Sequence, residues 1–232
     1  MAFAMNAKGH PDAGGYYYAV TVSRECLLYS KQREHSFGNG GAVPYDAGVD
    51  QKVVQQRQRA LEEADRYCQG FGVDSYSEYL SPTVTNEGRR LKDPLLLART
   101  ALAGADVADR KAAIENAMAF GDPYLLFSNP ELFFSGNSGG ATYFDGQWQQ
   151  QRASQLFTAA QLAACDLGMP CGSGLLLLKR KCAIESDCYG SFEEQVRNTW
   201  SAEEMGFINA ARAKIASAYQ SRDPGLFLPA GK

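Results

Sequence analysis

Three Asx-Pro pairs divide the middle of this 232-residue chain into segments that begin as helices begin. Asp or Asn at an N-cap accepts a hydrogen bond from an orphan backbone N–H, and a proline at the next position loses nothing by lacking that N–H. The pairs are Asp93-Pro94, Asp122-Pro123 and Asn129-Pro130. Each pair predicts a helix start, so the middle of the chain is predicted to be a series of short helices.

Two further signals mark where helices begin and end. In a Ser-x-x-Glu capping box, each side chain accepts a hydrogen bond from the other residue's backbone N–H. Such boxes occur at Ser75/Glu78, Ser191/Glu194 and Ser201/Glu204. Glycine readily takes the left-handed conformation that follows a last helical turn. Glycines in suitable places are Gly70, Gly104, Gly121 and Gly168.

Apolar residues recur at helical spacing between these signals. They predict helices over about 49–69, 95–103, 112–120, 148–164 and 207–219. The stretch Tyr16–Val22 has a β-like composition, but it runs directly into a helical pattern, so we interpret it as the start of the first helix. Clear alternating strand patterns are absent. The predicted fold class is therefore all-α, built from packed helical hairpins that disulfides staple together.

Two glycine-rich stretches, 36–48 and 135–147, interrupt the helical pattern. Neither is typical of a domain linker, because the helices predicted on both sides have comparable composition. We therefore expect a single helical domain over residues 15–232. The polar segment 1–14 is expected to be disordered.

Six cysteines constrain both the fold and the compartment. They are Cys26, Cys68, Cys165, Cys171, Cys182 and Cys188. An even number favours complete pairing, which needs an oxidising compartment. The last four are spaced C-x5-C-x10-C-x5-C, whereas zinc sites favour C-x2-C or C-x4-C. Structural disulfides are therefore favoured over a metal site.

The positions of the cysteines favour one pairing, because each of its two short bridges would staple a turn between helices. That pairing is Cys26–Cys68, Cys165–Cys171 and Cys182–Cys188. The main alternative for the last four cysteines is Cys165–Cys182 with Cys171–Cys188. In the chain-entropy model the long loop contributes about 4 kcal/mol to stability and each short one about 2.4 kcal/mol.

Composition argues against two classes of protein. The chain has 23 basic and 26 acidic residues, a net charge of −3, whereas nucleic-acid binders normally present a basic face. Its longest aliphatic run, Leu175–Leu178, is far short of the roughly 20 residues of a membrane span. Met1–Met5 is too short for the apolar core of a signal peptide. We expect a periplasmic or secreted protein whose targeting segment is missing from this sequence.

Motifs that would carry catalysis or hold a cofactor are not found. No H-E-x-x-H, G-x-S-x-G or Walker A pattern occurs, and the only histidines are His10 and His35. The adjacent carboxylates Glu62 and Glu63 would point apart on a helix. The sequence predicts no catalytic residue, no metal ion and no cofactor. An enzyme that acts on the cell wall through carboxylates remains an alternative.

The stretch 112–151 has no Lys or Arg but contains eight aromatic residues. Aromatic rings supply buried area at protein interfaces, and carboxylates steer a basic partner. Between Gly140 and Gly146, an exposed loop tip is expected. The predicted partner-binding residues are Tyr143, Phe144, Asp145, Trp148 and Glu131. The alternative for the tip is a structural plug beneath the loop.

The segment A-A-C-D-L-G-M-P-C-G at 163–172, with Leu175-Leu176, Cys182 and Cys188 after it, resembles a cysteine pattern of poorly characterised exported helical proteins of Gram-negative bacteria. The alanine-rich helices that end in Gly-Asp, and the segment Arg66–Gly70, look similar to Sel1-like hairpins, although no full Sel1 repeat is present. The resemblance covers about residues 60–190. It implies an exported, disulfide-stapled adaptor.

Some small periplasmic proteins of this kind protect their owner against a toxin delivered by a neighbouring cell. The resemblance therefore suggests an immunity protein that neutralises a basic, secreted antibacterial toxin by steric and electrostatic occlusion. A cell-wall enzyme and an envelope scaffolding protein are the alternatives. The sequence leaves the oligomeric state open.

Overall fold

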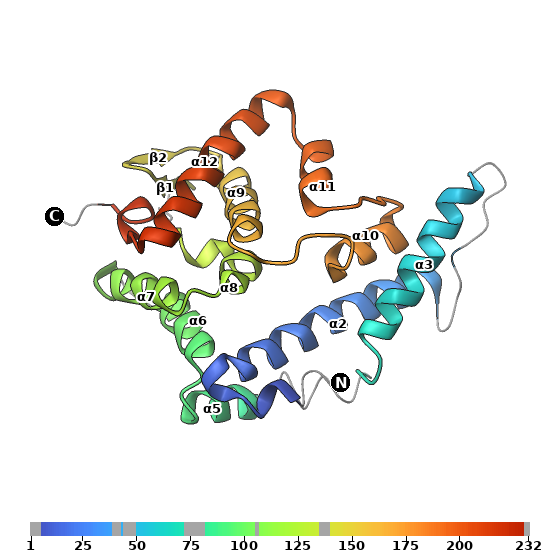
Figure 1. The fold of residues 1–232 in the computed structure, drawn as a ribbon, viewed down its shortest axis with the longest axis horizontal. Coiled ribbons are helices and arrows are strands. Elements are labelled where there is room, and N and C mark those ends of the chain that lie inside the picture. The colour runs from blue at the N-terminus through green and yellow to red at the C-terminus, as the bar shows by residue number, and fades with distance from the viewer. Residues whose placement is uncertain are drawn as a thin grey trace. The chain divides into compact units, whose positions relative to one another are not determined.

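The computed structural model describes residues 6–38, 43, 50–71, 82–104, 107–134 and 140–229 (Figure 1). Within these ranges the regular secondary structure is helical apart from one two-stranded hairpin and an isolated bridge between Gly172 and Ser191. The predicted all-α, disulfide-stapled fold is therefore confirmed. The capping box predicted at Ser75/Glu78 lies outside the described residues.

The chain packs into two compact units, each made from two separate stretches of sequence. Unit 1 comprises Met1–Leu96 and Cys171–Gln195, and unit 2 comprises Leu97–Pro170 and Val196–Lys232. The prediction of one domain over 15–232 stays a prediction. Within the N-terminal segment that was expected to be disordered, Pro11–Ala13 form a 3₁₀ helix, η1.

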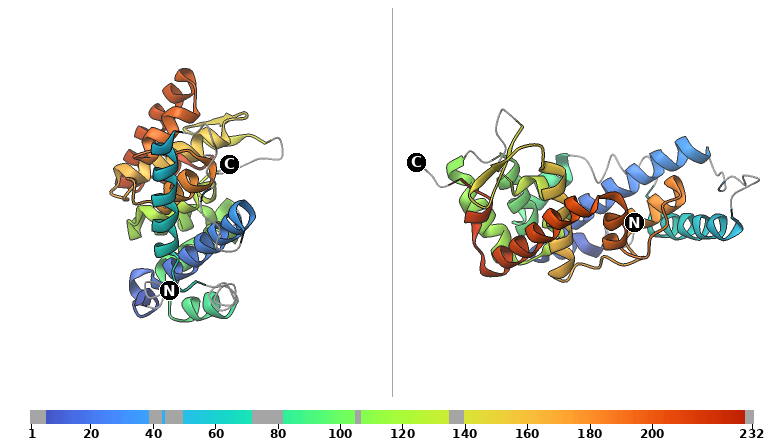
Figure 2. Two further views of the ribbon diagram at one scale, coloured as in Figure 1. Left: turned by 90° about the vertical axis from the view of Figure 1, so that its right-hand side faces the viewer. Right: turned by 90° about the horizontal axis from the view of Figure 1, so that it is seen from above.

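Unit 1 is built around the 23-residue helix α2, which packs on α5 and α10, while α3 packs along α10 (Figures 1 and 2). Its other helices are shorter than α2, and two of them, α6 and α11, continue into unit 2. The bounds are α2 (Gly15–Phe37), α3 (Gln51–Tyr67), α5 (Pro82–Arg90), α6 (Pro94–Gly104), α10 (Leu176–Glu185) and α11 (Phe192–Thr199).

The buried carboxylate of Asp93 caps two helices at once. It has no exposed surface, and it accepts hydrogen bonds from the backbone N–H of Tyr16 (2.7 Å) and Tyr17 (3.1 Å) in the first turn of α2. Its other oxygen accepts from Leu96 N (2.8 Å) in the first turn of α6. Burial raises the pKa of the Asp93 carboxyl, and these backbone hydrogen bonds oppose that rise. The Asp93-Pro94 pair thus starts α6, as predicted, and the Asp93 carboxylate also accepts hydrogen bonds from the first turn of α2.

Close backbone approach explains the glycine beside this cap. A Cβ at Gly88 in α5 would lie 2.7 Å from Tyr16 of α2 and from Leu96 of α6. Since real Cβ atoms do not approach heavy atoms so closely, only glycine lets the three helices meet here. The N-terminal ends of α2 and α6 are therefore fixed by both hydrogen bonding and packing.

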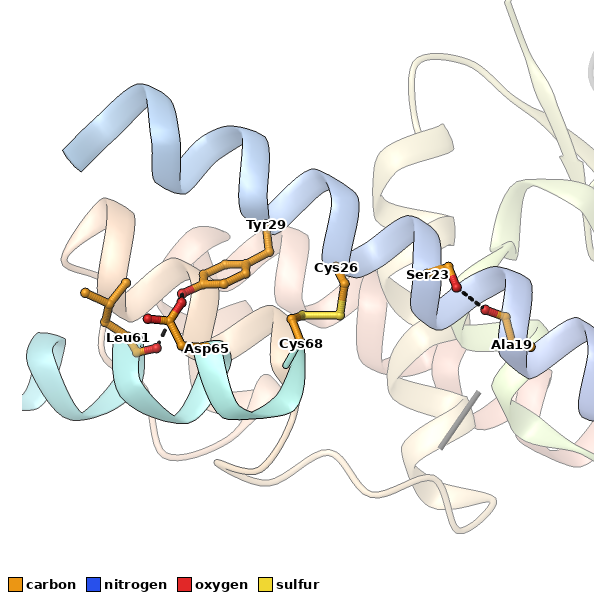
Figure 3. The surroundings of a disulfide bond; sticks show 7 residues. All are labelled: Ala19, Ser23, Cys26, Tyr29, Leu61, Asp65 and Cys68. Carbon is orange, nitrogen blue, oxygen red and sulfur yellow. Dashed lines mark hydrogen bonds between the residues drawn. A yellow bond between two sulfur atoms is a disulfide. The ribbon is translucent and has the colours of Figure 1, made fainter. Parts of the chain in front are cut away.

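The Cys26–Cys68 disulfide joins the middle of α2 to the end of α3, as predicted (Figure 3). One turn further along α2, the buried Tyr29 hydroxyl donates to Asp65 Oδ1 (2.7 Å). Arg33 donates to the other oxygen of that carboxylate (3.2 Å). Burial, with help from the hydrogen bond to Asp65, raises the pKa of Tyr29 well above its ordinary value, so the phenol stays a donor.

The predicted disulfide between Cys182 and Cys188 is also present. The remaining two cysteines, Cys165 and Cys171, are disulfide-bonded as well, and no cysteine of the chain is free. Helix α10 is further tied to α3 by polar contacts. The Arg57 guanidinium donates twice to the carbonyl of Ala183 (3.2 Å each), and Lys179 pairs with Glu63.

Unit 2 packs α12 along α9, and α9 on α8. The bounds are α7 (Val107–Phe120), α8 (Pro123–Ser128), η2 (Pro130–Leu132), β1 (Thr142–Phe144), β2 (Gln147–Gln149), α9 (Ala153–Asp166), α12 (Ala202–Ser221) and η3 (Pro224–Leu226). The prediction that a helix begins at Trp148 is wrong, because Trp148 lies on β2 and α9 begins at Ala153.

Aromatic rings fill the core of unit 2. Phe134 packs against three neighbouring rings, with centroid distances of 5.3 to 6.2 Å. The rings around it belong to Phe144, Phe157 and Phe227. Most of the aromatic residues in 112–151 are therefore structural, as the burial of Phe127, Phe133 and Phe134 also indicates.

Polar contacts fix α12 at its start and along its length. The Ser201/Glu204 capping box is present with both of its hydrogen bonds, as predicted. Further along, the Arg212 guanidinium donates to both oxygens of Asp166 at the end of α9 (2.6 and 2.7 Å). A forked guanidinium–carboxylate pair holds orientation as well as distance. Helix α12 therefore presents a fixed surface to the rest of unit 2.

We expect Asp93→Ala to lower the free energy of unfolding by about 3 kcal/mol, because two helices lose a cap and buried N–H groups lose their acceptor. Asp50→Ala is the matched control, since Asp50 caps only α3, at the surface (2.8 Å to Lys52 N). That variant should lose only about 1 kcal/mol. Urea denaturation of both variants measures the difference, and equal losses would contradict a double cap.

We expect the contribution of Glu63 to stability to disappear on acidification. The hydrogen bond and charge of Lys179 lower the pKa of the Glu63 carboxyl below its ordinary 4.5. A lowered folded-state pKa gives stability that is present above the ordinary pKa and is lost as the pH falls through the folded-state value. Glu63→Gln should therefore cost at most about 1 kcal/mol at pH 7, since the pair is partly exposed. Denaturation at a series of pH values should show this cost at pH 7 and a progressive loss of it as the pH falls below 4.5.

Candidate functional site

A β-hairpin carries four of the five residues predicted to bind a partner. Strand β1 (Thr142–Phe144) pairs antiparallel with β2 (Gln147–Gln149), and Tyr143 lies opposite Trp148. The two-residue turn between them is Asp145-Gly146, with φ of 51° and 80°. Positive φ at both turn residues gives a twist that matches paired strands, and Asp-Gly is a preferred sequence for it. The Asp145-Gly146 pair is therefore a hairpin signal present in the sequence, although the sequence analysis predicted no hairpin here.

The exposure expected for Tyr143 and Phe144 is wrong. Their side chains are only 8% and 4% exposed, and since neighbouring residues of a strand point to opposite faces, β1 is buried on both faces. Phe144 reaches the ring of Phe134 (centroids 6.2 Å apart). These two buried side chains anchor the hairpin. This is the alternative given above for the tip, a structural plug beneath the loop.

Trp148 is the aromatic residue that the hairpin leaves open to solvent. Its side chain is 43% exposed, and its ring meets that of Tyr143 edge-on, with centroids 5.5 Å apart and planes at 74°. The edge-on contact with a buried ring stabilises this orientation of the exposed indole. Asp145 is exposed at the turn beside it. Glu131 is exposed on η2, and it does not line the pocket at the hairpin turn.

A pocket of about 610 Å³ opens at the hairpin turn. Three segments of unit 2 line it: the turn itself, the second half of α12, and the residues around η3. The polar side chains among them belong to Asp145, Lys214, Ser217, Ser221 and Asp223. We call this the turn pocket. Sequence reasoning missed every member except Asp145, because α12 and η3 are more than 65 residues away along the chain.

The charges of the turn pocket are arranged by specific contacts. Lys214 forms an ion pair with Asp145, and the Asp145 backbone N–H donates to the carbonyl of Leu226 (2.9 Å). Asp223 Oδ1 accepts from Gly225 N (2.8 Å), which caps η3. The lining thus has two carboxylates and one ammonium group. The C-terminal end of α12, with its partial negative charge, adds to the excess of negative charge.

This arrangement suits recognition of a cationic group more than proton transfer. Both carboxylates already have a structural partner, and they hold a turn and a helix cap. The carboxyl whose pKa is raised by burial, Asp93, has no exposed surface and serves as a cap. A guanidinium or ammonium group that entered the turn pocket could share Asp145 with Lys214 and reach Asp223.

The described residues also bear on other kinds of site. In that part of the chain, no three His, Cys, Asp or Glu side chains are grouped so that they could hold a metal ion. None of the helices described is both long enough and apolar enough to cross a membrane.

Two glycine variants test the backbone of the hairpin turn. A Cβ at Gly146 would meet no atom within 4 Å, so Gly146→Ala tests only the positive φ and should cost about 1 kcal/mol. Gly206 in α12 is equally open but helical. Gly206→Ala should therefore stabilise unit 2 by about 0.5–1 kcal/mol. Thermal unfolding should give a lower melting temperature for Gly146→Ala and a higher one for Gly206→Ala. A higher melting temperature for both would contradict a positive φ at Gly146.

Comparison with known proteins adds no relative from which a function could be taken. No family model, no curated protein and no solved structure matches the chain. The similarity to exported, Sel1-like helical proteins therefore stays an expectation.

Proposed function

We propose that the chain is a protein-binding protein, and that unit 2 binds its partner through Trp148 and the turn pocket. The observation that carries the proposal is Trp148 itself. An indole that is 43% exposed, but held by a buried tyrosine on an anchored hairpin, loses little conformational freedom when a partner covers it. Tryptophan is among the residues most enriched at the energetic centre of protein interfaces.

The charges of the turn pocket support a basic partner. The pocket opens beside the exposed hairpin turn, and Asp145 and Asp223 outnumber Lys214 among its charged groups. A partner that places an aliphatic or aromatic surface on Trp148 and a Lys or Arg in the pocket would satisfy both features. Exposed carboxylates at the rim would also speed association with a positively charged protein.

The compartment and the biological role extend the same proposal. Three disulfides in a chain of this size fit a protein that works in an oxidising compartment such as the periplasm. There, an exposed indole on an anchored hairpin, beside a pocket with an excess of carboxylates, fits an inhibitor that occludes a basic target. We therefore propose an immunity protein that neutralises a basic antibacterial toxin. An envelope scaffolding protein and a cell-wall enzyme are the alternatives that the experiment separates.

The proposal is tested by affinity capture with three versions of the oxidised protein as bait: wild type, Trp148→Ala and Phe120→Ala. Phe120 is the matched control, since it is an exposed aromatic side chain of unit 2 that does not line the turn pocket. A basic protein should be captured by wild type and by Phe120→Ala. Its affinity for Trp148→Ala should fall by about 30-fold or more, the loss typical of an interface centre.

The purified partner then decides the biological role. If the partner is a toxin, adding wild-type protein in equal amount should abolish its activity, and Trp148→Ala should restore most of it. Equal capture by all three baits would contradict a site at Trp148. Weak capture of several envelope proteins would favour a scaffold, and turnover of cell-wall fragments without any stable partner would favour the enzyme.

A further inference from the structure

A second pocket, in unit 1, contains a disulfide in its wall. It has a volume of about 270 Å³ and lies along α3 and α10. Cys182 and Cys188, which form a disulfide, both line it. Cys182 is on α10, and Cys188 follows in the irregular segment before α11. We call this the disulfide pocket.

The two disulfides of unit 1 differ in their access to solvent. Cys26 is completely buried and Cys68 nearly so, in the core that α2 and α3 share. Cys182 is buried in the same core, but its partner Cys188 is partly exposed and faces an open pocket, so the difference rests on Cys188. Exchange needs a thiolate to approach a sulfur atom, so a pocket beside a disulfide makes it a target in the folded protein.

The charges of the disulfide pocket are mainly positive. Arg59 and Lys179 line it, with Glu63 as the only acidic side chain among the lining residues. Glu63 is paired with Lys179, which leaves the Arg59 guanidinium as the excess charge. Reactive cysteine sites are typically partly exposed and electropositive, because positive charge stabilises the thiolate that attacks or leaves.

We propose that the disulfide pocket is a thiol-exchange site, at which a small acidic thiol opens the Cys182–Cys188 disulfide. The pocket volume limits the thiol to a small molecule, and the excess positive charge favours one that bears a carboxylate. The proposal is independent of the site at Trp148, because it rests on different residues and on the other unit.

The small thiol is the only other reactant in the exchange, which takes two steps. The thiolate attacks Cys188 Sγ and forms a mixed disulfide there, while the bond to Cys182 breaks and Cys182 leaves as a thiolate. A second thiolate can attack the outer sulfur of that mixed disulfide. It forms the symmetrical disulfide of the small thiol and releases Cys188 as a thiolate, so two thiols are oxidised for each protein disulfide reduced.

Helix α10 would remain in place after the disulfide opens. The hydrogen bonds from Arg57 to the carbonyl of Ala183 hold it on α3, and so does the pair between Lys179 and Glu63. Leu176, Leu178 and Ala183 stay buried beneath it. The expected change is therefore confined to residues 186–190, where Ser186 already has a positive φ of 67°.

The test is exposure of the folded, fully oxidised protein to three thiols: mercaptoacetate, glutathione and the cationic thiol cysteamine. Reaction is stopped with an alkylating agent, and peptide mass spectrometry reads each cysteine. Each rate is divided by the rate of the same thiol with the urea-unfolded chain, which corrects for the reactivity of the thiol itself. Cys188 should form a mixed disulfide at least tenfold faster than Cys26 or Cys68. Mercaptoacetate and glutathione should exceed cysteamine, and salt should reduce the difference.

Two charge variants separate an electrostatic site from simple access. Arg59→Gln should slow the reaction of Cys188 with mercaptoacetate by about threefold, the effect of one partly screened charge. Glu63→Gln, which frees Lys179, should speed it. The rate at Cys26–Cys68 is the internal control, because a variant that merely destabilises the protein would raise both rates.

Three results would overturn the proposal. Equal rates at all disulfides would show that exchange follows global unfolding. Faster reaction at Cys165 or Cys171 than at Cys188 would place the reactive disulfide elsewhere. Equal corrected rates for mercaptoacetate and cysteamine, unaffected by Arg59→Gln, would exclude a site selective for acidic thiols.

Discussion

The arrangement of helices in unit 1 depends on the hydrogen bonds that the buried Asp93 carboxylate accepts. One oxygen caps α2 and the other caps α6, so a single buried side chain fixes where two helices begin. Helix α2 then carries Cys26 and Tyr29, whose contacts hold α3. Helix α3 in turn carries Arg57 and Glu63, which hold α10. Loss of the Asp93 carboxylate would therefore weaken the position of α2, and through α2 the positions of α3 and α10, which line the disulfide pocket.

Unit 2 is organised by aromatic packing, and its hairpin depends on that packing. A two-stranded hairpin is marginal in water by itself. Phe144 joins it to the ring cluster around Phe134, and Asp145 joins it to Leu226 and Lys214. The rings that looked like an interface in the sequence are mostly the anchor. What remains for a partner is Trp148, held in place by that anchor.

Local signals made the helices and two disulfides predictable, since caps and short spacings act within a few residues. Asp93, Asp122 and the Ser201/Glu204 box all cap helices as predicted. The sequence carries two competing signals around Trp148. Asp145-Gly146 indicates a hairpin, but the apolar spacing of 148–164 predicts a helix that would include Trp148. The turn pocket could not be predicted, since Lys214 and Asp223 meet Asp145 only after α12 packs on α9. The contact of Asp93 with α2 could not be predicted either, because Tyr17 is 76 residues from Asp93 along the chain.

The central claim, that unit 2 binds a protein through the hairpin face, is tested most directly by hydrogen exchange of the captured complex. Backbone amides of 142–149, 213–218 and 221–226 should exchange more slowly with the partner bound than in the free protein. Amides of α2 and α3 should be unchanged, since they belong to unit 1. Slowed exchange confined to unit 1, with the hairpin unaffected, would contradict the assignment of the binding site.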